Sequence, residues 1–244
     1  MPRCTVPDPV TGKACGRPTM RAAKQGLSAF MCRKHVLHRQ RHGSAWCPSP
    51  SAAALRPYLK AALSHVNLHR AHDPYVRAAL AGLSELMASA GQATIATRLK
   101  GLTPDQRARV ALARLREKGT KPARLIAIVL AVHALIDEAP ATVHRTREFR
   151  IVAIAKAAHR LASGTHRRWR DDQGKVLTEM HSYPRSAGRV LRSLGAMLEQ
   201  ACELVIDHHL AAVLVLKLKR YGPHPANASA AGAKPSGTTA RLPA

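Results

Sequence analysis

The chain has 244 residues and is strongly basic, with 39 lysine and arginine residues against 14 aspartate and glutamate residues and a formal net charge of +25. Such a charge favours a polyanionic partner, either nucleic acid or an acidic membrane surface. The composition argues against a transmembrane protein, because the longest strongly apolar run, 125–136, is shorter than the roughly twenty residues that a membrane-spanning helix needs.

Four of the five cysteines lie within the first 47 residues, which indicates a metal site in a reducing compartment rather than a disulfide framework. We therefore expect a cytoplasmic protein. Only eight aromatic residues occur in the chain, too few for a surface on which single-stranded bases stack. Contact with a duplex through arginine and lysine fits this composition better.

Residues 1–47 contain a complete donor set for one tetrahedral metal ion: Cys4, Cys15, Cys32 and His35. Cys32 and His35 are three positions apart, so one helical turn places both donors on the same face. The residues between Cys4 and Cys15 include proline, aspartate and glycine, which predict a turn. Three thiolates and an imidazole are a usual ligand set of structural zinc. The sequence therefore predicts a zinc-binding module in which an arm with two cysteines closes on a helix.

The ligand set has alternatives. Cys47 is a spare donor, and His38 or His42 could replace His35; the cysteines could also be ordinary buried or reactive residues without a metal. In the absence of metal the segment has too few apolar residues for a core of its own, so metal binding would supply the folding free energy. The residues available for burial are Leu27, Phe30, Met31, Val36 and Leu37.

A resemblance covers residues 3–44. It is carried by Arg3-Cys4, then Cys15-Gly16-Arg17-Pro18, then Cys32-Arg33-Lys34-His35, and finally the stretch Arg39-Gln40-Arg41-His42-Gly43-Ser44. This pattern resembles the short Cys3His modules of phage and bacterial mobile-element proteins, and it is similar to the WRC module of plant transcription regulators. The resemblance implies zinc and nucleic-acid contact, and it carries no catalytic residue.

After a linker at 48–50, apolar periodicity predicts a mostly α-helical domain over 51–221. N-capping patterns begin helices at Asp73-Pro74 and Thr103-Pro104. The pattern around Asp171 to Gly174 breaks the helical period and predicts a β-hairpin near 169–183. Residues 222–244 are rich in small residues and proline, and we expect them to be disordered. The helices are expected at 51–71, 73–90, 104–119, 122–138, 146–163 and 186–221.

The helices at 104–119 and 122–138 have the spacing of a helix-turn-helix motif. The second one is apolar on all sides from Leu125 to Val132, whereas a recognition helix presents polar side chains to the bases. We therefore favour a structural helical hairpin. Its first helix could still face phosphates through four arginines: Arg107, Arg109, Arg114 and Arg116.

The last helix carries an acidic stripe, Glu199, Glu203 and Asp207, followed by His208 and His209. Such residues could bind a catalytic metal, which makes a metal-dependent nuclease one alternative function. We favour an exposed face paired with basic residues, because no second helix supplies matching carboxylates. Cys202 is then a core residue. No other catalytic motif occurs, so we expect a protein that is not an enzyme.

These observations predict a zinc-containing nucleic-acid-binding protein whose partner is duplex DNA. The main alternative is an interaction or assembly protein that docks through the zinc module. Two sets of basic residues are predicted to contact nucleic acid. The first is Arg33, Lys34, Arg39 and Arg41 in the module; the second is Arg167, Arg168 and Arg170 on the hairpin, with Arg185, Arg189 and Arg192 after it.

Overall fold

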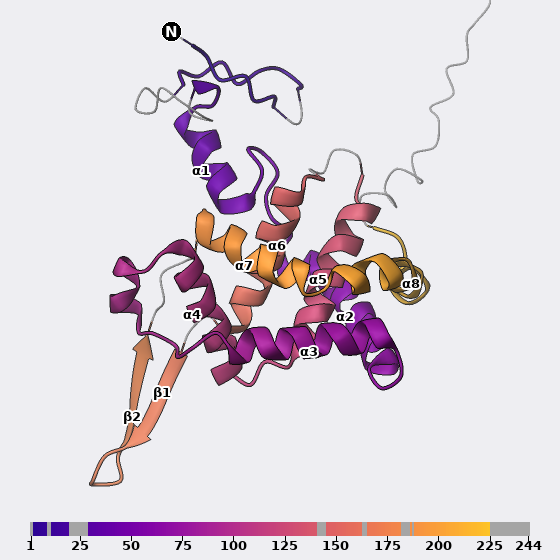
Figure 1. The fold of residues 1–244 in the computed structure, drawn as a ribbon. Coiled ribbons are helices and arrows are strands. Elements are labelled where there is room, and N and C mark those ends of the chain that lie inside the picture. The colour runs from indigo at the N-terminus through magenta and orange to yellow at the C-terminus, as the bar shows by residue number, and fades with distance from the viewer. Residues whose placement is uncertain are drawn as a thin grey trace, which may run out of the picture.

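The computed structural model describes residues 2–8, 11–19, 29–140, 145–162, 165–181, 186 and 188–224, with only the backbone at 96–97, 165–169 and 176–181. The described part is mostly helical, as the sequence predicts (Figure 1). The α-helices are α1 (Arg33–His42), α2 (Ala52–His69), α3 (Pro74–Ala88), α4 (Pro104–Glu117), α5 (Pro122–Glu138), α6 (Arg147–His159), α7 (Arg189–Gln200) and α8 (Glu203–Tyr221). Two short 3-10 helices, η2 (Ala96–Gly101) and η3 (Arg160–Ala162), and two strands, β1 (Thr165–Arg170) and β2 (Val176–His181), complete the described elements.

The predicted N-caps start their helices. The Asp73 carboxylate accepts the Val76 N–H at 2.8 Å and begins α3. Thr103 and Gln106 form a complete capping box at the start of α4. Both helices have proline at a position where a missing backbone N–H costs nothing.

Helix α5 is the centre of the core. Every residue from Leu125 to Ile136 is buried, and the helix contacts α2, α3, α6, α7 and α8. This burial leaves α5 no free face for a DNA groove, and it confirms that this helix belongs to the core.

The prediction of a single helix over 186–221 is wrong, because the chain forms two helices, α7 and α8, separated at Ala201 and Cys202. The two helices have different partners, since α7 packs on α6 and α4 while α8 packs on α2 and α5. One straight helix could not bury both apolar stripes. Gly195 lets α7 approach α6 closely, because a Cβ at this position would collide with the carbonyl oxygen of Ile151. Cys202 is fully buried at the break, as expected of a core residue.

Strands β1 and β2 pair antiparallel, from Thr165 opposite His181 to Arg170 opposite Val176. The Asp171 carboxylate organises the connecting turn by accepting the N–H groups of Gln173 and Lys175. Gly174 supplies the positive φ, 76°, in this turn. The pair starts at residue 165, earlier than the expected 169, and it projects from the end of the molecule opposite α1 (Figure 1).

The N-terminal module is fixed to the helical domain through Glu148 in the first turn of α6. Its carboxylate receives the guanidinium groups of Arg39 from α1 and Arg192 from α7. The backbone N–H of Gly188 donates to the carbonyl of Gln40, so the start of α7 lies against the end of α1. Gly43 ends α1 with φ 72°, and a Cβ there would collide with the backbone of Glu148. The glycine after the basic stretch is therefore required for docking.

Replacing Glu148 by glutamine is expected to loosen this docking. Burial raises the pKa of Glu148, but hydrogen bonds from Arg39 and Arg192 outweigh it, so the pKa lies below its ordinary value. The group therefore contributes stability above its unfolded pKa, and this contribution is lost as the pH falls through its folded pKa. We expect Glu148→Gln to lower the free energy of unfolding by roughly 1–3 kcal/mol at neutral pH, measured by urea denaturation. Glu117→Gln on α4 is the control, and an equal loss in the control would contradict this role of Glu148.

A buried polar chain connects α2, α3 and α8. His65 Nε2 lies 2.9 Å from His209 Nδ1, and His209 Nε2 lies 3.1 Å from the Asp73 carboxylate. Burial, with smaller contributions from the charges of His69 and His209, lowers the pKa of His65 to about 4, although Asp73 opposes the shift.

Because the unfolded chain protonates His65 near its ordinary pKa of about 6.5, we expect stability to fall between about pH 6.5 and pH 4. The variant His65→Gln keeps a hydrogen-bonding group but does not titrate. It should reduce the slope of unfolding free energy against pH in this window by an amount that corresponds to up to about one bound proton. Chemical denaturation across the pH series measures this slope. An unchanged slope would contradict the assignment to His65.

No helix in the described part of the chain is long and apolar enough to cross a membrane. The predicted tail lies mostly outside the described residues, which end at 224. Before that point, the backbone N–H of His224 donates to the Glu138 carboxylate at 2.6 Å.

Candidate metal centre and basic surfaces

The arm that carries Cys4 and Cys15 is built from short antiparallel bridges. Arg3 pairs with Pro18 and Pro7 pairs with Ala14. The Cys4 N–H donates to the Arg17 carbonyl at 2.8 Å, and the Cys15 N–H donates to the Val6 carbonyl at 2.9 Å. This ladder holds the two cysteines on opposite strands of the arm.

Cys32 and His35 sit in the first turn of α1, as their spacing predicts. Cys32 is the N-cap residue, and its carbonyl accepts the Val36 N–H. The Thr5 N–H donates to the Phe30 carbonyl at 3.2 Å, which ties the arm to the segment before the helix. The arm and the helix thereby bring four donors together.

The four donor atoms of Cys4, Cys15, Cys32 and His35 all lie within 4.8 Å of one another. Cys4 Sγ and Cys32 Sγ lie 3.2 Å and 3.5 Å from His35 Nδ1, and Cys15 Sγ lies 4.0 Å from Cys32 Sγ. A tetrahedral zinc ion bound to these atoms would set S···N distances of about 3.6 Å and S···S distances of about 3.8 Å. The cluster therefore has the size of a tetrahedral metal site, and it is the only such group of metal-binding residues in the described part of the chain.

The three alternative donors have other partners. His38 Nδ1 lies 2.8 Å from the Ser44 carbonyl oxygen. His42 Nδ1 accepts the Ser49 N–H at 2.9 Å, which ties the expected linker back to α1. Cys47 is buried in the core of the helical domain. The geometry thus favours His35 as the fourth donor.

Burial affects the pKa of His35, Cys4 and Cys32. It lowers the pKa of His35, with help from the positive charges of Lys34 and Arg17, and so favours the neutral imidazole that binds metals. It raises the pKa of Cys4. Burial also raises the pKa of Cys32, but hydrogen bonds to its thiolate, chiefly from the His35 backbone N–H, outweigh this effect. The pKa of Cys32 therefore lies below its ordinary value.

The module has its own small core, against which Met31 packs. Two of the residues available for burial, Phe30 and Leu37, are 63% and 40% exposed. Val6 and Ala45 are buried with Cys4 and Cys32 instead, and Trp46 packs against both this cluster and the main core. Sequence periodicity misses these residues because they lie in irregular segments outside any helix.

One face of α1 is basic. With about 100° between successive residues, Arg33, Lys34 and Arg41 lie within one arc of about 100°, while His35 and Arg39 lie on the other side of the helix. All three basic side chains of this arc are exposed, and α1 contains no acidic residue. Arg189, the exposed first residue of α7, lies near the end of α1, because the N–H of the preceding Gly188 donates to the carbonyl of Gln40 in α1. We call Arg33, Lys34, Arg41 and Arg189 the basic face.

Two other predicted contact residues, Arg39 and Arg192, bind Glu148 and serve docking. Sequence reasoning missed Glu148, because nothing local shows that one carboxylate will meet arginines far away in the chain. Arg167 and Arg168 are placed by their backbone in β1, Arg170 is exposed at the end of that strand, and Arg185 lies outside the described residues. The two predicted surfaces are therefore not continuous: α7 contributes to the basic face, and the strands lie at the far end (Figure 1).

The arginines of α4 are largely used within the fold. Arg114 is buried and donates to the Ala162 carbonyl. Arg116 donates to the Met87 carbonyl at the end of α3, and Arg107 donates to the Leu102 carbonyl just after η2. Only Arg109 of the four is exposed. Among the four arginines that could face phosphates, Arg109 therefore has the most exposed side chain.

The acidic stripe of the last helix does not form. The break between α7 and α8 separates Glu199 from Glu203 and Asp207, which are exposed. Glu199 is buried and not on an exposed face as expected: it receives Arg147 at 2.7 Å and lies 3.4 Å from His133. His209 faces Asp73 and His65 instead of this carboxylate.

Comparison of the chain with protein-family models, with curated proteins and with solved structures finds no match.

Proposed function

We propose that this protein is a zinc-containing, non-catalytic protein that binds duplex DNA through the basic face. The observation that carries the proposal is that this face begins directly beside the four-donor cluster. The same helix turn that supplies Cys32 and His35 also supplies Arg33 and Lys34. Metal binding would order α1 and hold these cations in place.

Zinc is the metal that best suits three cysteines and one histidine. A closed set of four protein donors leaves no position for a substrate, which is typical of a structural site. The module's resemblance to Cys3His modules of mobile-element proteins supports the same assignment.

The electrostatics favour a phosphate backbone. Three exposed cations lie on one face of α1 and a fourth, Arg189, is exposed near the end of that helix, in a chain with a net charge of +25. Side chains of this kind contact phosphates and position a protein on DNA without reading its sequence. Arg167, Arg168, Arg170 and Arg185 would make a second, separate contact at the other end of the molecule.

Docking of another protein is the alternative function, and one observation favours it. Phe30 and Leu37 are large apolar residues exposed on the module, and Leu37 lies within the basic arc of α1. Apolar residues in a basic rim are also found at protein interfaces.

One preparation tests both functions. Metal content is measured first, and a mobility-shift assay with random duplex DNA follows at about 50 mM salt, where electrostatic attraction is strong. We expect one zinc per chain and a DNA complex that weakens steeply with salt. A protein that contains zinc but binds neither DNA nor RNA would support the docking alternative.

A further inference from the structure

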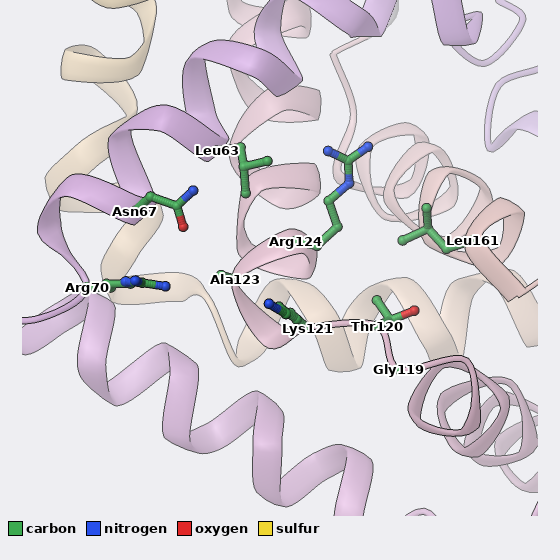
Figure 2. Close-up of a pocket in the computed structure, with 9 residues that line it drawn as sticks. All are labelled: Leu63, Asn67, Arg70, Gly119, Thr120, Lys121, Ala123, Arg124 and Leu161. Carbon is green, nitrogen blue, oxygen red and sulfur yellow. The ribbon is translucent and has the colours of Figure 1, made fainter.

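A cavity of about 620 Å³ lies at the end of the helical domain, away from the metal cluster. It is formed by the end of α2, the turn between α4 and α5, the start of α5 and η3 (Figure 2). Its polar wall carries three cationic side chains, Arg70, Lys121 and Arg124, and its apolar wall is Leu63, Ala123 and Leu161. The volume is typical of a pocket for a small molecule and much larger than a phosphate ion needs.

The charge of this cavity is uncompensated. No acidic residue lines it, and its three cations form no ion pair with a carboxylate in the described part of the chain. By contrast, Arg39, Arg147 and Arg192 each bind a glutamate. Three cations around one cavity repel one another, and a bound anion would relieve this repulsion.

The arrangement of the side chains suits an extended ligand. In Figure 2, Arg70 and Lys121 extend toward each other, while Arg124 extends away from them between Leu63 and Leu161. Lys121 is the N-cap of α5, and the first turn of this helix contains no acidic residue. The positive end of the helix dipole therefore adds to the positive potential in the cavity. One end of the cavity is therefore cationic, and the other combines a guanidinium with an apolar wall that could hold a ring.

We propose that this cavity binds a phosphate-bearing small molecule of nucleotide size. Arg70 and Lys121 would hold the phosphates, and Arg124 would bind or stack on the remainder of the ligand against the apolar wall. This inference is independent of the proposed DNA contact, because none of the basic-face residues lines the cavity.

Titration of the full chain with ADP by isothermal calorimetry at about 0.15 M salt tests the proposal. We expect saturable binding to one site, about tenfold weaker in Lys121→Gln and in Arg124→Gln, since each variant removes a charge-assisted hydrogen bond. Ala123→Leu adds volume inside the cavity without changing the charge, and it should abolish ADP binding while DNA binding by the basic face stays unchanged. Arg109→Gln removes an exposed charge outside the cavity and should bind ADP as the unmodified protein does.

Thermal unfolding of each variant confirms that the fold is retained. The proposal is overturned if ADP shows no saturable binding, or if Arg109→Gln weakens it as much as Arg124→Gln does, which would indicate general attraction to the basic surface. It is also overturned if Ala123→Leu leaves ADP binding intact. ADP binding that is lost together with DNA binding in basic-face variants would assign the nucleotide to that face and not to the cavity.

Discussion

Replacing Cys32 by serine is expected to reduce the zinc content from one ion per chain to nearly none. Cys32 supplies a thiolate and also begins α1, so its loss removes a ligand where the helix meets the arm. Structural zinc sites contribute about 10–16 kcal/mol of binding free energy at neutral pH, far more than the small core of this module offers. We therefore expect the arm and α1 to unfold. Metal analysis and far-ultraviolet circular dichroism measure the two effects.

The helical domain should survive the same substitution in a weakened form. Its core is centred on α5 and contains no residue of the arm, but unfolding of α1 would remove Arg39 from Glu148. We expect a loss of roughly 1–3 kcal/mol, which lowers the midpoint of thermal unfolding by about 2–12 °C for a domain of this size.

Cys47→Ser is the matched control, because it makes the same chemical change at a buried cysteine outside the cluster. It should keep the full zinc content. Full zinc content in Cys32→Ser, or its loss in Cys47→Ser, would show that the ligand set is wrong.

The parts of the structure that depend on local chemistry could be predicted from the sequence. Asp73 and Thr103 begin helices because a side chain three residues before a free N–H can accept it, and this is visible in the chain itself. The spacing of Cys32 and His35 predicts their shared helical turn for the same reason.

Features that depend on distant partners could not be predicted in this way. Apolar spacing continues from α7 into α8, so periodicity alone does not show that the two stripes face different helices. Likewise, nothing in the sequence around Arg39 or Arg192 distinguishes them from arginines that are exposed to solvent. Only the fold brings Glu148 between them. The cationic cavity combines residues from α2, the α4–α5 turn and η3, which no sequence motif connects.

Replacing all four residues of the basic face, Arg33, Lys34, Arg41 and Arg189, by alanine is expected to have the largest effect on DNA binding. Each phosphate contact releases counterions and contributes about −0.9 to the slope of log affinity against log salt. The variant should therefore have a slope flatter by about 3.6 units if every residue contacts a phosphate. Fluorescence anisotropy with a labelled random duplex, over about 50–200 mM salt, measures the slope.

The matched control removes the same number of exposed charges from other helices, with Arg56, Arg77, Arg109 and Lys219 replaced by alanine. If attraction is spread over the whole surface, the two variants should flatten the slope equally, and the basic face is then not the binding site. If the face binds DNA, the control slope stays close to that of the unmodified protein. Arg39→Ala distinguishes docking from contact: because Arg39 binds Glu148, its replacement should lower stability more than it flattens the salt slope. A flattening of a full 0.9 unit with unchanged stability would instead place Arg39 among the phosphate contacts.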